Sequence, residues 1–148
     1  MIRNRVTLAV VLVLLGLPLT ACAQESVEAG PEKPAVVEEI GGSDLYRITL
    51  TARAAARLDI QTAPIRETVV DGRRLLVMPY GAILWDASGA TWTYTSPEDL
   101  VFVRAPVSLD HIEGDQAILT DGPEAGTSVV MVGAAELWGA ENGVGGGH

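Results

Sequence analysis

The sequence has 148 residues, which fits one folded domain with short appendages. Hydrophobic residues make up 48% and charged residues 20% of it, a balance that excludes wholesale disorder and fibrous repeats. The formal net charge of −9 argues against sequence-independent binding to nucleic acid, because the phosphates would be repelled. A single cysteine excludes an internal disulfide and a zinc site built from cysteines.

Residues 1–21 are typical of a bacterial export signal. Arg3 and Arg5 supply positive charge, and an apolar stretch follows from residue 6 to residue 19. This stretch has 14 residues, too few for a membrane-spanning helix, which needs about 20. The sequence Leu-Thr-Ala-Cys at residues 19–22 then matches a lipoprotein signal, in which the cysteine thiol receives a diacylglyceryl group. We therefore expect cleavage before Cys22 and lipidation of Cys22; the alternative is an ordinary secreted protein.

Residues 22–43 contain five Glu and one Lys, with Pro and Gly but no apolar periodicity. Such a segment buries too little apolar surface to fold by itself, so it predicts a flexible acidic tether. The alternative is a first strand at Val36-Val37. At the other end, residues 141–148 are rich in Gly and predict a flexible tail.

Residues 44–140 have the pattern of a mainly β domain. Only residues 51–58 indicate a helix, since Thr51 is a good N-cap and alanines share a face with Leu58, leaving Arg53 and Arg57 in solvent. Short apolar or alternating segments, separated by Asp, Gly and Pro, are candidates for strands at residues 45–50, 60–65, 68–70, 73–78, 82–85, 91–95, 100–109, 116–120 and 127–132. We expect a small barrel or sandwich of six to seven short strands with one short helix.

Aromatic side chains are few, and three of them cluster in the sequence. Residues 91–95 alternate Thr with Trp92 and Tyr94, so these two rings point to one face. A turn at residues 86–89 brings Trp85 close to Trp92 across a hairpin. Trp85, Trp92 and Tyr94 are either packed in and near the core or form a patch that faces a partner.

The sequence contains few features typical of an enzyme. The sequence has no nucleophile elbow, phosphate-binding loop or dinucleotide fingerprint. Asp110, His111 and Glu113 stand close together in a turn-like segment, but nothing nominates the further ligands that a metal site requires. We therefore expect no catalytic residue, no resident metal and no cofactor.

Several segments resemble motifs of one protein family, in the same order. Residues 75–84 (LLVMPYGAIL) resemble V-P-x-x-A-V/L, residues 102–107 (FVRAPV) resemble F-x-R-x-x-V, and residues 121–130 (DGPEAGTSVV) resemble G-L-x-x-G-x-x-V-V. Further matches are residues 50–65, 89–94 and 133–137. These are motifs of periplasmic adaptor subunits, the membrane-fusion or HlyD-like family of efflux systems. The chain resembles their membrane-proximal domain only.

The departures from that family define what the resemblance implies. Full adaptors carry a β-barrel, a lipoyl domain and a helical hairpin between the two halves of the membrane-proximal domain, whereas only residues 66–74 separate the halves here. Together with the lipoprotein signal, the resemblance therefore implies a lipid-anchored, non-catalytic module that docks on an efflux permease at the outer face of the cytoplasmic membrane. Trp85, Trp92 and Tyr94 would supply the docking surface. The alternatives are a stand-alone ligand- or metal-binding lipoprotein and, with least support from the sequence, an enzyme.

Overall fold

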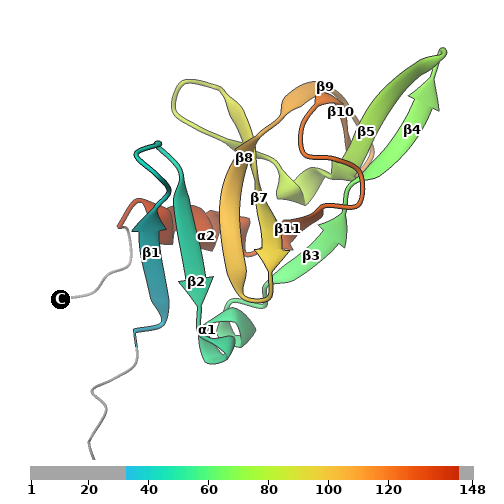
Figure 1. Ribbon diagram of the computed structural model, residues 1–148. Helices are drawn as coiled ribbons and strands as arrows, with labels where there is room; N and C mark the ends of the chain where they lie inside the picture. Colours follow the sequence, from blue (N-terminus) through green and yellow to red (C-terminus); the bar gives the residue numbers. More distant parts are fainter. Residues whose placement is uncertain (1–32, 144–148) are drawn as a thin grey trace, which may run out of the picture. The chain divides into compact units, whose positions relative to one another are not determined.

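The computed structural model describes residues 33–143, which form a mainly β domain of two antiparallel sheets (Figure 1). The expected fold class is confirmed, because the two sheets make a sandwich-like arrangement and no closed barrel. Eleven strands are present in the described region, more than the six to seven expected. The number is higher because an additional strand precedes residue 44, residues 100–109 form two strands, and each of the other candidate segments forms a strand of its own.

Seven strands form the larger sheet: β1 (Ala35–Glu39), β2 (Tyr46–Leu50), β3 (Gln61–Pro64), β6 (Leu84–Trp85), β7 (Thr91–Glu98), β8 (Val101–Pro106) and β11 (Ser128–Val132). Their order is β1-β2-β8-β7-β11-β3, and the short β6 pairs with the start of β7. This order places β7 in the interior of the sheet, with hydrogen-bonded neighbours on both sides.

Four strands form the smaller sheet: β4 (Arg66–Val70), β5 (Arg73–Pro79), β9 (Ser108–Glu113) and β10 (Gln116–Asp121). Their order is β4-β5-β10-β9. The expected turn at Asp71 and Gly72 joins β4 to β5. Strand β10 pairs with β5 only from Leu76 to Pro79, so the β4–β5 hairpin extends beyond its neighbour (Figure 1).

The chain crosses between the two sheets four times, and buried residues mark three of the crossings. Ile65 alone separates β3 from β4, and Val107 alone separates β8 from β9. A third crossing consists of the 3₁₀ helix η1 (Tyr80–Ala82) and Ile83. The expected strand at residues 100–109 therefore divides at Val107, after Pro106, which has no amide hydrogen for a ladder. The buried crossing residues pack with strand residues of both sheets in the core between the sheets, which contains Ile65, Met78, Ala82, Ile83, Val107, Ala117, Leu119 and Val129.

Two helices cover the opposite face of the larger sheet. The expected helix is confirmed as α1 (Ala52–Arg57), whose N-cap Thr51 accepts a hydrogen bond at 3.1 Å from the amide of Ala54. A second helix, α2 (Ala134–Glu141), packs against β1, β2 and β7. The core under the helices contains Ile48, Leu50, Ala54, Tyr94, Phe102, Val130, Ala134 and Leu137. Within residues 33–143, neither helix has the length and apolar character needed to cross a membrane.

The structure corrects the expected tether and tail where it describes them. Ala35–Glu39 form strand β1, which pairs with β2 along its whole length, in agreement with the alternative of a strand at Val36-Val37. An edge strand needs few buried side chains when its neighbour forms hydrogen bonds with its backbone. The acidic composition of β1 therefore does not prevent the pairing. Glu141, expected in the flexible tail, is the last residue of α2. Residues 22–32 and 144–148 lie outside the described part of the chain.

Two glycines give a matched test of how β11 is joined to α2. Gly133 has φ 88° and a Cβ there would collide with the side chain of Ile60, whereas Gly89 has φ 85° with open space around it. Gly89→Ala should cost about 1–2 kcal/mol of unfolding free energy, the penalty of a left-handed residue. Gly133→Ala should cost about 0.5–1.5 kcal/mol more, because the terminal methyl group of Ile60 must move out of its preferred position to avoid the new Cβ. Urea unfolding of both variants measures the difference. Equal losses of unfolding free energy would show that the side chain of Ile60 moves aside without cost.

Candidate functional site

The three aromatic residues expected to face a partner do not share one surface. Tyr94 is fully buried, Trp92 is half-buried, and Trp85 is 48% exposed. The expectation that Trp92 and Tyr94 share a face is confirmed, because both lie beside Arg104 and its ion-pair partner. The expectation of a three-residue patch is wrong for Tyr94, since its side chain is buried in the core between the larger sheet and the two helices. Cys22 lies outside the described residues.

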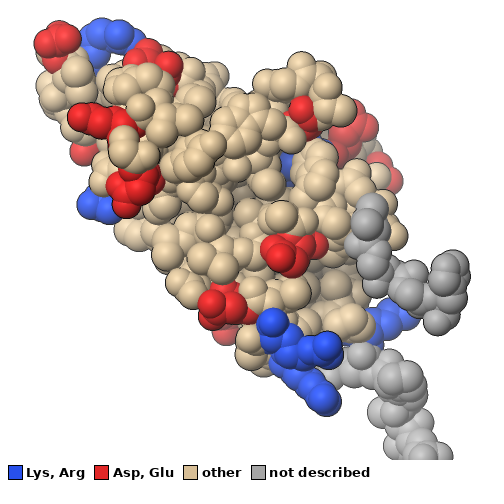
Figure 2. Space-filling model, turned by 180° about the vertical axis from the view of Figure 1, so that it is seen from behind, with Lys and Arg blue, Asp and Glu red and all other residues tan. Residues whose placement is uncertain are grey.

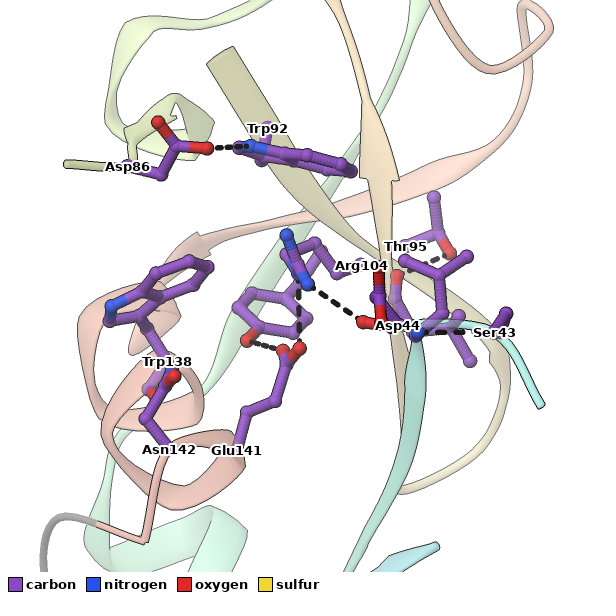
Figure 3. A network of polar contacts seen from close by, with 12 residues as sticks. Ser43, Asp44, Asp86, Trp92, Thr95, Arg104, Trp138, Glu141 and Asn142 are labelled. Atoms are coloured by element: carbon purple, nitrogen blue, oxygen red, sulfur yellow. Dashed lines mark hydrogen bonds and ion pairs between the residues drawn. The ribbon is translucent and has the colours of Figure 1, made fainter. Parts of the chain in front are cut away.

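Trp92 instead contributes to a cluster centred on Arg104 of β8 (Figure 3). The guanidinium carbon lies 4.1 Å from the ring centroid of Trp92 and 5.1 Å from that of Trp138 on α2. A guanidinium over the face of an indole is attracted by the electron-rich ring and is weakly hydrated. The two indoles therefore hold the cation in an apolar setting, where only 11% of its side chain is exposed.

The charge of Arg104 is balanced by Glu141 at the end of α2. Arg104 Nε donates to Glu141 Oε1 at 3.0 Å, and Arg104 Nη2 donates to the carbonyl of Asp44 at 3.0 Å. The other carboxylate oxygen of Glu141 accepts from the hydroxyl of Tyr94. Burial raises the pKa of Tyr94, and the bond to the Glu141 carboxylate raises it further, so the phenol stays protonated as a donor.

These contacts join four parts of the chain: the segment before β2, strands β7 and β8, and helix α2. The Glu141 side chain is 3% exposed, so both charges have left bulk water and depend on each other. We call Trp92, Tyr94, Arg104, Trp138 and Glu141 the arginine clamp. The clamp has polar partners within the domain for each of its charged groups, so its role is to hold the domain together.

Asp86 holds the indole of Trp92 in place through a hydrogen bond to the ring nitrogen. One carboxylate oxygen of Asp86 accepts from the amides of Ser88 and Ala90 and from the Ser88 hydroxyl, at 2.6–3.0 Å. The other oxygen accepts from Trp92 Nε1 at 3.0 Å. The hydrogen bond from the Ser88 hydroxyl, followed by that from Trp92, lowers the pKa of Asp86 to about 2. The expected turn at residues 86–89 thus also fixes the indole that covers Arg104.

Trp85 points away from the clamp and pairs with a residue that the sequence did not single out as exposed. Its ring meets that of Tyr80 edge to face, with centroids 5.8 Å apart and an interplanar angle of 62°. The expectation that Trp85 pairs with Trp92 is therefore wrong. In the hairpin, Trp85 lies opposite Thr91. Tyr80 is 42% exposed, and we call Tyr80 and Trp85 the aromatic pair.

The aromatic pair stands on a well-anchored segment. The amide of Tyr80 donates to the carbonyl of Asp115 at 2.8 Å, and the next side chains, Ala82 and Ile83, are buried in the core between the sheets. Two large half-exposed rings on a fixed backbone lose little conformational entropy on binding, which is why Trp and Tyr are frequent in protein interfaces. The aromatic pair is therefore the candidate interaction site of the domain.

The acidic residues and histidine of β9 do not assemble into a larger site. His111 Nδ1 lies 2.8 Å from Asp110 Oδ2, and both side chains are exposed at the sheet edge. Among the residues that the structure describes, no three His, Cys, Asp or Glu side chains come together as metal ligands would. Asp110, His111 and Glu113 lie in a strand and not in the turn expected from the sequence.

The chain matches no protein-family model, no curated protein and no solved structure.

Titration of Asp86 can be observed through Trp92. A lowered pKa means that the stabilisation from ionised Asp86 is complete above its ordinary pKa of 3.8 and is lost as the pH falls through about 2. The indole N–H resonance of Trp92 should therefore stay in place from pH 7 to pH 4 and shift with a midpoint near 2. In Asp86→Asn this titration should disappear. A midpoint near 3.8 in the unaltered protein would contradict the contacts described.

Removal of one charge from the arginine clamp should destabilise the domain strongly. Arg104→Met leaves the buried Glu141 carboxylate without its cation, a change that costs about 3–5 kcal/mol. Adding Glu141→Gln removes that charge while its amide oxygen can still accept from Tyr94, so the double variant should recover more than half of the loss. Urea unfolding gives both values.

A surface ion pair serves as the matched control for this experiment. Arg47 and Glu98 lie 3.1 Å apart with both side chains well exposed, so Arg47→Met should cost no more than about 1 kcal/mol. Equal losses for Arg47→Met and Arg104→Met would show that the clamp behaves as an ordinary surface contact.

Proposed function

We propose that this chain is a lipid-anchored, non-catalytic adaptor-like module that associates with an efflux transporter at the outer face of the cytoplasmic membrane. The observation that carries the proposal is the aromatic pair, Tyr80 and Trp85, exposed on a backbone that the core holds in place. Such a pair fits a protein–protein contact, in which a few rigid aromatic side chains supply most of the affinity.

The location rests on the sequence. The signal pattern that ends at Cys22 supports a diacyl anchor, and two acyl chains hold a protein on a membrane far more stably than one. Anchoring raises the local concentration of the domain around a membrane partner, so a modest contact through the aromatic pair suffices for association. The resemblance of residues 44–140 to a membrane-proximal adaptor domain supports an efflux permease as that partner.

Crosslinking in cells, followed by pull-down of the tagged protein from membranes, tests the proposal. The unaltered protein should recover a transporter. The Cys22→Ala variant should be absent from the membrane fraction and should recover no transporter. Trp85→Ala should lower recovery of the transporter by about tenfold or more, as expected for a central interface residue.

Ile112→Ala is the matched control. Ile112 is an exposed apolar residue on β9 in the smaller sheet, and its loss should leave recovery unchanged. If the unaltered protein recovers no transporter, or if Trp85→Ala behaves as Ile112→Ala does, the adaptor role is wrong.

A further inference from the structure

An open groove lies between α1, α2 and the start of the described chain, on the helical side of the larger sheet. Its volume is about 1070 Å³, just above the roughly 300–1,000 Å³ that small-molecule sites occupy. Its apolar lining includes Pro34, Ala35, Val37 and Leu58, which are partly or fully exposed, above a floor of the buried residues Leu50, Ala54 and Leu137. The groove is separate from the aromatic pair, none of whose residues line it.

The space is left open by small side chains. Helix α2 borders the groove with the small residues Ala135, Gly139 and Ala140 as well as with Glu136 and Leu137, and α1 borders it with Ala54 and Arg57. The result is an apolar surface that is sheltered on several sides but not filled.

Positive charge stands at the rim of this groove, although the chain as a whole has a net charge of −9. Lys33 and Arg57 line it, with Glu136 as the single acidic residue of the lining. Within residues 33–143, neither Lys33 nor Arg57 takes part in a salt bridge. In Figure 2, Lys and Arg side chains gather at one end of the back of the molecule, over α1.

We propose that this groove binds a single-chain anionic amphiphile, a long-chain fatty acid. The acyl chain lies along the apolar lining, so that both apolar surfaces are removed from water. The carboxylate lies at the rim, where it meets the ammonium of Lys33 and the guanidinium of Arg57. A neutral apolar ligand would leave both cations without a partner, so the charge favours an anion. The proposal does not rest on the adaptor role.

A photoreactive fatty acid, with a diazirine near the end of its chain, tests this site. The full chain with Cys22→Ala is labelled below the critical micelle concentration, and mass spectrometry maps the labelled peptides. Label should fall on residues of α1 and α2, unlabelled palmitate should compete, and the fatty alcohol of the same length should compete more weakly. Label spread over other surfaces, or no saturable labelling, would overturn the proposal.

Two arginines on one helix provide the matched control. Arg57 lines the groove, whereas Arg53, four residues earlier on α1, does not line it although it is also exposed to solvent. Arg57→Gln should weaken binding by about two- to fivefold, the value of an exposed ion pair, and Arg53→Gln should not. Equal effects of the two variants would reduce the charge at the rim to a nonspecific attraction and overturn the proposed carboxylate site.

Filling the groove gives an independent measurement. Ala135 is an exposed residue of the lining, so Ala135→Trp should place a large ring in the groove without disturbing the core. This variant should abolish labelling while its urea unfolding curve stays close to that of the unaltered protein. Full labelling of a folded Ala135→Trp variant would show that the fatty acid binds elsewhere.

Discussion

One guanidinium holds together parts of the domain that are far apart in the sequence. Arg104 on β8 binds Glu141 on α2 and the backbone of Asp44, and lies between the indoles of Trp92 and Trp138. A buried charge is tolerated only when a partner is held close by, so the helix has to extend as far as Glu141 and has to stay on the sheet. The position of α2 in turn defines one wall of the groove and covers the core around Leu137.

Much of the fold follows from local patterns in the sequence. The N-cap at Thr51, the turns at residues 71–72 and 86–89, and the alternation of residues 91–95 each predict the element found. These signals depend on near neighbours in the chain. Strand β1 could not be predicted with the same success, because its pairing depends on β2 and its own composition is acidic.

The site was harder to predict, because burial depends on the packing of distant elements. The alternation in β7 indicates that Trp92 and Tyr94 share a face, but whether that face is open depends on α2, a helix not expected from the sequence. Two signals were available: Arg104 stands within an apolar strand, and residues 134, 137 and 141 recur at helical spacing with helix-favouring Ala, Leu and Glu. Tyr80 had no such signal, since its exposure follows from how η1 rests on the core.

The crossings between the sheets affect how the domain unfolds. Where a single residue such as Ile65 or Val107 joins strands of different sheets, neither sheet can move away without pulling a buried side chain from the core that both share. The backbone at these points is also engaged: the Ile65 amide donates to the carbonyl of Thr127, and the Val107 amide donates to that of Thr91. Local opening at one sheet would therefore spread to the other, so the domain should melt in one cooperative transition, with no half-folded form that keeps one sheet and loses its neighbour.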